Sequence, residues 1–169
     1  MKILDVGCGS KPWGNINLDL NVGKSKHHKF SYDVKQIKNF TRGDATSLPF
    51  KNKSIDVLIA RHCLEHIPEP LKAVIEFERV TREKIIIMVP NNPTNTEFKT
   101  HIYSWSLVSL KNFLNLVFEN VEVYPNSPFS DLYKMRSLRP ILGKSYYKFP
   151  LNRLIGSLFG FQLTAIVRL

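Results

Sequence analysis

The sequence predicts an α/β fold built on a mostly parallel sheet. Short apolar runs alternate along the chain with segments of helical periodicity, which is the order of elements in sheets whose strands are joined by helices. The run from Ile85 to Val89 is continuous, largely β-branched and closed by Pro90, as expected of a strand that is buried on both faces. Gly7 and Gly9 follow directly after the first apolar run, where a parallel sheet commonly binds its ligand.

The spacing of apolar residues predicts the individual elements. Strands are predicted over residues 2–6, 15–20, 39–42, 55–60, 85–89, 121–124 and 161–169. A helix is predicted over residues 69–80, starting at two prolines. Its apolar positions recur near the helical period, at Leu71, Val74, Ile75, Phe77 and Val80. A second helix is predicted over residues 106–118, with Ser106 as its cap.

Residues 1–169 are predicted to form a single domain, because the length and the 43% hydrophobic content suit one core. The longest nearly apolar run, residues 154–167, is shorter than the roughly 20 residues of a membrane helix, so we expect no integral membrane segment. Met1 is followed at once by a strand, which leaves no room for a targeting leader. Cys8 and Cys63 are too few for a disulfide framework. These features predict a protein with reduced thiols in the cytoplasm.

The glycines after the first strand and the acid after the second predict a ligand site. Gly7 and Gly9 let the backbone turn sharply and approach a ligand without an intervening Cβ. Asp19 ends the second predicted strand, where an acid can accept hydrogen bonds from ribose hydroxyls. Five residues separate Gly9 from Asn15, so the helix that usually follows the first strand of such a sheet must be missing or reduced to one turn.

Further motifs stand in a fixed order along the chain. They are D-x-G-C-G at residues 5–9, the acid at 19, G-D-A at 43–45, L-P-F at 48–50, D-x-apolar at 56–59 and L-x-H-I at 64–67. In this combination the sequence resembles the class I S-adenosylmethionine-dependent methyltransferases, most closely the small type 11 branch, over residues 2 to about 118. The resemblance implies a Rossmann-like, doubly wound sheet of the seven-strand methyltransferase type with its last strand antiparallel.

The resemblance also implies the cofactor S-adenosylmethionine and the residues that bind it. By resemblance Asp19 holds the ribose, Asp44 lies near the adenine amine and His66 packs near the methionine portion. The full predicted cofactor site is Asp5, Gly7, Cys8, Gly9, Asp19, Leu20, Asp44, Ala45, Arg61 and His66. Asp5 has a structural alternative, in which it only braces the backbone.

The catalytic residue is left open by the sequence. Methyl transfer needs a general base only if the acceptor must first lose a proton. His101 and Tyr103 lie between the fifth strand and its helix, where the family often meets its substrate, and are the candidate bases. The alternative is that His101, Tyr103 and Trp105 are packing residues of that loop.

Other functional classes are less consistent with the sequence. His62, Glu65 and His66 fit H-x-x-E-H, a zinc hydrolase pattern that needs one regular helix. Pro68 and Pro70 follow too soon for such a helix, so we expect no metal. A dehydrogenase is disfavoured because the loop lacks a third glycine and a following helix to receive a pyrophosphate. A non-catalytic module acting through its basic surface is the remaining alternative.

The net charge of +10 is concentrated in two segments. Residues 24–42 and residues 126–160 each hold six Lys or Arg against one Asp. In the second segment aromatic residues are interleaved with the basic ones, which predicts a basic aromatic insertion in the domain. This mixture suits a nucleic acid, an anionic lipid or a phosphorylated small molecule, and a solvated basic face is the alternative. We therefore expect an anionic methyl acceptor and a location in the cytoplasm or at the periphery of a membrane.

Overall fold

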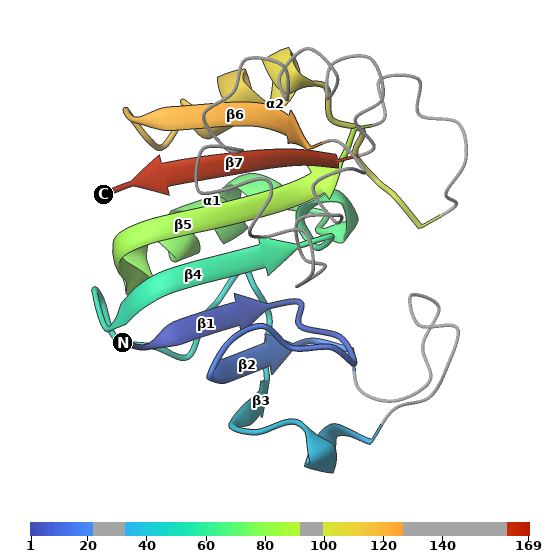
Figure 1. The fold of residues 1–169 in the computed structure, drawn as a ribbon, viewed down its shortest axis with the longest axis vertical. Helices are drawn as coiled ribbons and strands as arrows, with labels where there is room; N and C mark the ends of the chain where they lie inside the picture. The colour runs from blue at the N-terminus through green and yellow to red at the C-terminus, as the bar shows by residue number, and fades with distance from the viewer. Residues whose placement is uncertain (22–32, 92–99, 127–161) are drawn as a thin grey trace, which may run out of the picture.

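The computed structural model describes residues 1–21, 33–91, 100–126 and 162–169 (Figure 1). In these ranges one seven-stranded sheet has the order β3-β2-β1-β4-β5-β7-β6. Its strands are β1 (Ile3–Val6), β2 (Ile16–Asp19), β3 (Phe40–Arg42), β4 (Ile55–Arg61), β5 (Thr81–Pro90), β6 (Val121–Asn126) and β7 (Gln162–Arg168). Only β7 runs antiparallel to its neighbours β5 and β6, so the predicted doubly wound sheet with an antiparallel last strand is confirmed.

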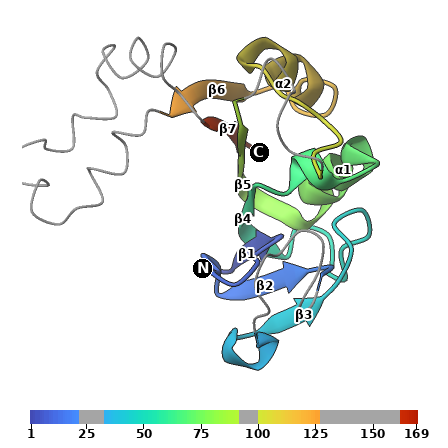
Figure 2. The same ribbon diagram turned by 90° about the vertical axis from the view of Figure 1, so that its right-hand side faces the viewer.

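Two α-helices, α1 (Pro70–Val80) and α2 (Leu107–Leu114), lie on the same face of the sheet (Figure 2). Two short 3-10 helices, η1 (Val34–Gln36) and η2 (Leu64–His66), complete the described helical elements. The predicted second helix is too long, because α2 ends with its C-cap at Asn115. Strand β5 is longer than predicted and begins at Thr81, which is also the C-cap residue of α1. Among the described residues, no helix combines the length and apolarity that a membrane crossing requires.

The buried face of α1 differs from the face that the apolar pattern predicts. Its buried residues are Pro70, Ala73, Val74, Phe77 and Val80. Leu71 and Ile75 are instead 40% and 48% exposed. Spacings of three and four residues place the buried positions on a single stripe. Leu71 and Ile75 each follow a buried residue by about 100° around the helix axis and lie outside that stripe. Small Ala73 is part of the stripe because it allows the helix to pack closely on the sheet.

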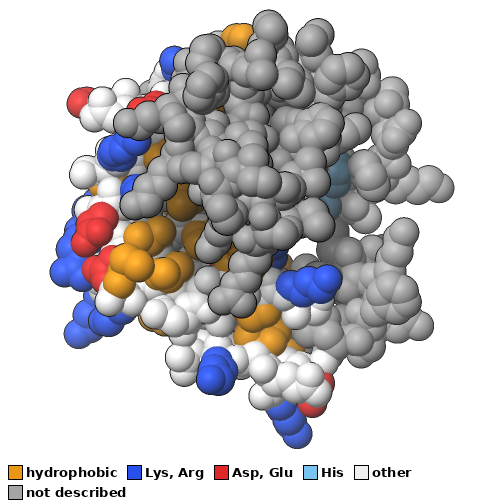
Figure 3. All heavy atoms as spheres, in the orientation of Figure 1, with side chains coloured by type: hydrophobic (Ala, Val, Ile, Leu, Met, Phe, Trp, Pro, Cys, Tyr) orange, Lys and Arg blue, Asp and Glu red, His pale blue; other side chains and the backbone are white. Residues whose placement is uncertain are grey.

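Strand β5 is buried fully on one face only. Ile85, Ile87 and Val89 are 0% exposed and belong to the same core as Val74 and Phe77 of α1. Ile86 and Met88, on the opposite face, are partly exposed, so the prediction of burial on both faces is wrong. The reason is that no described helix covers this second face. Figure 3 views the molecule from that side and shows hydrophobic side chains at the surface.

Candidate functional site

A cavity of about 530 Å³ lies at the carboxyl ends of the central parallel strands. Its lining comprises the ends of β1 and β2 (residues 6–7 and 18–21), the loop after β3 (43–46), the segment after β4 (62–63 and 66–69), and residues 100 and 102. The strand order reverses between β1 and β4, and ligands of doubly wound sheets bind at such a reversal. The cavity therefore lies where the glycine and acid motifs predict a site.

The turn after β1 requires glycine at position 7. Gly7 has φ +69°, and a Cβ there would approach Cys63 Sγ to 2.7 Å. The backbone N–H groups of Gly7 and Cys8 both donate to the carbonyl of Leu18, at 2.8 and 3.2 Å. These bonds tie the turn to β2, and Gly7 lines the cavity at this turn. A side chain at position 7 would collide with Cys63.

No helix follows β1 in the described residues, as predicted. The chain instead returns along β1, where Asn15 N–H donates to the Ile3 carbonyl at 3.0 Å. Gly14 passes so close to that strand that a Cβ would lie 2.7 Å from the Ile3 oxygen. Trp13 N–H donates to Asp5 Oδ2 at 2.7 Å. A helix cannot form in this segment because its backbone is bonded to β1 and to Asp5.

Asp19 ends β2 with its carboxylate fixed inside the cavity wall. The side chain is 6% exposed and lines the cavity. Its Oδ2 accepts the N–H of Gly9 at 2.9 Å and its Oδ1 accepts the N–H of Asn21 at 2.8 Å. An ionised carboxylate offers about four acceptor positions, so half of them are used by the protein. Gly9 thus contributes by positioning Asp19, and Leu20 beside it lines the cavity with a 51% exposed side chain.

Asp44 and Ala45 lie in the loop after β3 and both line the cavity. Asp44 is exposed, and its Oδ1 accepts the N–H and the hydroxyl of Thr46, each at 2.8 Å. This Asx-type turn sets the direction of the carboxylate. The structure thus brings together Gly7, Asp19, Leu20, Asp44, Ala45 and His66 of the predicted cofactor site around one cavity.

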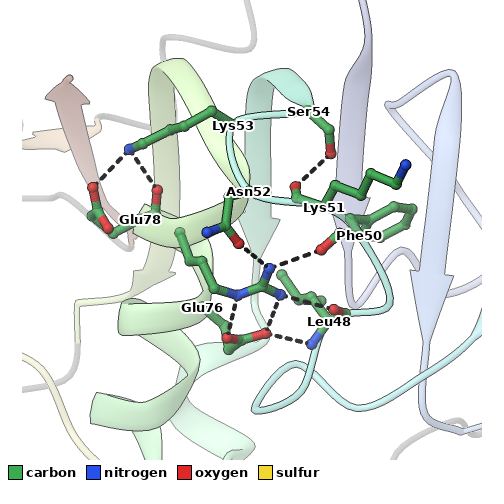
Figure 4. Close-up of polar contacts among 9 residues, drawn as sticks. Leu48, Phe50, Lys51, Asn52, Lys53, Ser54, Glu76 and Glu78 are labelled. Carbon is green, nitrogen blue, oxygen red and sulfur yellow. Dashed lines mark hydrogen bonds and ion pairs between the residues drawn. The ribbon is translucent and has the colours of Figure 1, made fainter.

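Helix α1 holds the continuation of this loop through two charged residues. Arg79 pairs with Glu76 at 2.6 Å and donates to the carbonyls of Phe50 at 2.8 Å and Leu48 at 3.0 Å. Glu76 Oε2 accepts the Leu48 N–H at 2.7 Å, and the hydrogen bond from Arg79 lowers the pKa of Glu76. Figure 4 shows these bonds converging on the loop from the helix, next to the exposed Lys53. The loop that carries Asp44 is therefore anchored to the core.

Asp5, Cys8, Gly9 and Arg61 are the predicted cofactor residues that do not line the cavity. Asp5 is 0% exposed, and burial raises its pKa, while the Trp13 N–H and the Arg61 guanidinium oppose that shift. Arg61 donates to the Lys11 carbonyl at 2.8 Å and lies 4.2 Å from the centre of the Trp13 ring. Asp5 and Arg61 thus hold the loop after β1 from both sides, which is the bracing alternative for Asp5.

Cys8 and Cys63 are both free thiols. Cys8 is buried, and this burial raises its pKa to about 12, with the charges of Asp19 and Asp5 adding to the effect. Burial likewise raises the pKa of Cys63 far above its usual value. Both side chains remain neutral thiols and are poor nucleophiles.

The segment after β4 brings His62, Glu65 and His66 close together without a long helix. His62 has φ +49°, a left-handed conformation in which histidine is more frequent than most residues. The 3-10 helix η2 contains only Leu64–His66, so the helix that a zinc hydrolase pattern needs is absent from these described residues. His62 and His66 line the cavity, whereas Glu65 is 1% exposed and does not.

The candidate bases lie beside this segment, but their side chains do not line the cavity. The Tyr103 hydroxyl donates to the Pro68 carbonyl at 3.0 Å, and its ring stacks on Trp105 at 5.9 Å. The His101 ring packs edge-on against His66, with 4.8 Å between centroids. Burial lowers the pKa of His101, and the charge of Glu65 opposes this effect. The described contacts of Tyr103 are those of a packing residue.

Sequence reasoning missed several lining residues, among them Asn21, Thr46, Glu69, Thr100 and Ile102. Asn21 and Thr46 each follow a predicted site residue, Asp19 or Asp44, by two positions. Their places in the loops that follow β2 and β3 could have indicated them. Thr100 and Ile102 come from the distant loop before α2 and carry no local motif. Most of the two basic segments, with the expected insertion, lies outside the described residues.

A glycine turn after the first strand and an acid that ends the second are typical of α/β proteins that bind a nucleoside-containing cofactor at the carboxyl ends of their strands. The family model described as "Methyltransferase domain", of type 11, matches residues 4–89. The chain belongs to this methyltransferase family, and S-adenosylmethionine is the cofactor that the family implies.

Two curated relatives and one solved structure show how far the similarity extends. The demethylmenaquinone methyltransferase of Renibacterium salmoninarum is 30% identical over 139 residues, 73% of this chain and 55% of the relative. The phthiotriol/phenolphthiotriol dimycocerosates methyltransferase of Mycobacterium leprae is 35% identical over 92 residues, 46% of this chain and 34% of the relative. The chain spans about half the length of the first relative and about a third of the length of the second.

A crystal structure of a SAM-dependent methyltransferase from Archaeoglobus fulgidus has a TM-score of 0.65 at 20% identity. The similarity covers 99% of this chain and 85% of that one. It shows that the two chains share their fold.

Proposed function

We propose that this chain is an S-adenosylmethionine-dependent methyltransferase. The observation that carries the proposal is the carboxylate of Asp19, which ends β2 inside the cavity and is held by the N–H groups of Gly9 and Asn21. The acceptor positions that these two bonds leave suit the two hydroxyls of a ribose. Membership of the methyltransferase family supports a methyl donor instead of a nicotinamide dinucleotide.

The cavity fits this cofactor in size and in its lining. Its volume of about 530 Å³ falls within the roughly 300–1,000 Å³ of small-molecule sites. Gly7, whose missing Cβ allows Cys63 to pack against it, lines the cavity at the end of β1 together with Cys63. We assign the ribose to Asp19, the adenine to the side of Asp44 and Ala45, and the methionine portion to the side of His66.

When bound, S-adenosylmethionine supplies a methyl group on a positively charged sulfur, which is already an excellent leaving group. The main task of the protein is therefore to hold the acceptor in line with that methyl group. Asp19 and the anchored loop of Asp44 contribute by fixing the position of the donor.

The acceptor in this proposal is a quinone-like or lipid-like molecule at an anionic surface. Support comes from the names of the two relatives, which act on demethylmenaquinone and on phthiotriol or phenolphthiotriol dimycocerosates. The basic and aromatic residues of segment 126–160 are suited to anionic headgroups around such an acceptor.

Titration calorimetry with S-adenosylmethionine and S-adenosylhomocysteine tests the cofactor assignment. One molecule of either should bind per chain. Binding of neither would leave only the fold and would favour the non-catalytic module. Binding of NADH in their place would favour the dehydrogenase.

Methylation of demethylmenaquinone in anionic and in neutral vesicles tests the acceptor. Lys144→Glu with Lys148→Glu should raise KM in anionic vesicles and leave the affinity for S-adenosylmethionine unchanged. Lys51→Glu with Lys111→Glu is the matched control, because it changes the net charge equally at exposed described positions. An unaltered KM at low ionic strength would show that segment 126–160 does not contact the surface.

A further inference from the structure

Glu65 is a buried acid without a hydrogen-bonding partner in the described structure. It is 1% exposed, and neither Oε1 nor Oε2 accepts a hydrogen bond. His62 Nδ1 lies 3.6 Å from Oε1, beyond hydrogen-bond distance. The residue is nevertheless held in place, because its backbone carbonyl accepts the N–H groups of Ile102 and Tyr103 at 2.9 and 3.2 Å. A buried carboxylate of this kind favours a bound cation, because an ionised group in the interior is strongly destabilising unless it is paired.

Two histidines offer metal-ligating nitrogens beside this carboxylate. One ligand atom each from Glu65, His66 and His101 lies within 4.8 Å of the others. His66 Nδ1 lies 2.9 Å from the Thr100 carbonyl, and a nitrogen can bond to a carbonyl only as the N–H donor. This tautomer leaves the lone pair on Nε2, and a backbone carbonyl that orients a histidine in this way is typical of metal sites.

We infer that Glu65, His66 and His101 bind a divalent transition-metal ion at the edge of the cavity. Two imidazoles and one carboxylate are a ligand set that Zn²⁺ accepts and that Mg²⁺, which prefers oxygen ligands, does not. Tetrahedral bonds of about 2.0–2.2 Å require ligand atoms roughly 3.5 Å apart. The three side chains must therefore close by about 1 Å around the ion.

This set differs from the H-x-x-E-H pattern in the sequence. Glu65 and His66 are shared, but the second imidazole comes from His101, in the loop before α2, instead of from His62. No long helix is needed, because the two segments are brought together by the bonds from Ile102 and Tyr103 to the Glu65 carbonyl. The proposed metal site therefore differs from the sequence-based expectation of no metal, although the long helix of the zinc hydrolase pattern does not form in these described residues.

Among the described residues the site has three protein ligands, a number that in catalytic zinc sites leaves one coordination position open. His66 lines the cavity, so this position is available to water or to an oxygen atom of a molecule in the cavity. Metal binding itself is independent of the proposed function. Only a role for the ion toward the methyl acceptor rests on it.

Calorimetric titration of tag-free, chelator-treated protein with ZnCl₂ tests the inference. The wild-type chain should bind one Zn²⁺ and melt at a higher temperature with it, whereas MgCl₂ should have little effect. Glu65→Gln and His101→Ala should each weaken Zn²⁺ binding at least tenfold. Circular dichroism without metal shows whether the variants are folded. If His101→Ala does not fold, the nearly isosteric Glu65→Gln still tests the site.

Two control variants should bind Zn²⁺ as the wild type does. Glu83→Gln removes an exposed acid near the amino end of β5, and His27→Ala with His28→Ala removes the histidines outside the described residues. Absence of stoichiometric Zn²⁺ binding, or equal affinity in the wild type and Glu65→Gln, would overturn the inference. Binding of S-adenosylhomocysteine to the same samples reports separately on the proposed function.

Discussion

Asp19 and Glu65 are two buried acids of the site region with opposite environments. Asp19 is 6% exposed, and both of its oxygens accept backbone N–H groups. Glu65 is 1% exposed, and no described residue donates a hydrogen bond to either of its oxygens. The carboxylate of Asp19 is therefore held in place by the protein before any ligand binds. The carboxylate of Glu65, in contrast, is buried without a hydrogen-bond donor among the described residues. The comparison separates a prearranged part of the site from a part that a ligand must complete.

The largest effect is expected from loosening the prearranged wall. Arg79→Met should lower the free energy of unfolding by about 3 kcal/mol, because it breaks a partly buried ion pair and frees the loop that carries Asp44. Chemical denaturation measures this loss. Lys53→Met, which removes the exposed pair with Glu78, is the control and should cost less than about 1 kcal/mol.

The loss in Arg79→Met should also depend on pH. Arg79 lowers the pKa of Glu76 below its ordinary 4.5, so the pair stabilises the fold above that pH and ceases to do so as the pH falls below it. The difference between wild type and variant should therefore shrink in acid. A difference that does not change with pH would mean that Arg79 acts only through its bonds to backbone carbonyls.

A slightly smaller effect is expected from Asp19→Ala. The variant should bind S-adenosylmethionine more weakly by about 1.5–3 kcal/mol, the range for hydrogen bonds to a charged group. Titration calorimetry gives this difference, with the exposed Asp33→Ala as control. Unchanged affinity in Asp19→Ala would remove Asp19 from the ribose site.

Glu65→Gln should raise the stability of the fold, whereas Arg79→Met lowers it. Without metal at pH 8 the variant should be more stable than the wild type by about 1 kcal/mol, because a neutral amide replaces a buried carboxylate that accepts no hydrogen bond from the described residues. Thermal unfolding in the presence of a chelator measures it. A loss of stability would mean that Glu65 already has a stabilising partner and that the contrast with Asp19 is false.

The smallest effect is expected at Asp5. Burial raises its pKa, so the charged form is disfavoured in the folded state, and the charge lowers stability as the pH rises through the folded-state pKa. Asp5→Asn keeps an oxygen acceptor for the Trp13 N–H and should be modestly more stable at neutral pH. The gain should disappear below the ordinary pKa of 3.8, which melting curves across this pH range would show.

The sequence predicted the sheet and the prearranged wall well, because both depend on local signals. Asp19 ends an apolar run and Gly7 follows one, so their places at the strand ends follow from chain order. The buried face of α1 was predicted less well. Residue type alone does not show that the small Ala73 is buried and the apolar Leu71 exposed. Packing against the sheet decides which of them is buried.

The Glu65 segment could not be predicted in the same way. His101, which shares the proposed metal site, lies 36 residues further along the chain. Tertiary contacts bring the two together, among them the backbone bonds from Ile102 and Tyr103 to the Glu65 carbonyl. The contacts of Asp5 and Arg61 could not be predicted from chain position either. Both stand at the ends of central strands, yet both contact the loop after β1 instead of the cavity.

A crystal structure of the chain with S-adenosylhomocysteine bound tests the central claim most directly. We predict that both ribose hydroxyls lie within hydrogen-bond distance of the Asp19 carboxylate, the adenine beside Asp44 and Ala45, and the homocysteine portion on the side of His66. A ribose bound away from Asp19, or a ligand outside the cavity, would contradict it.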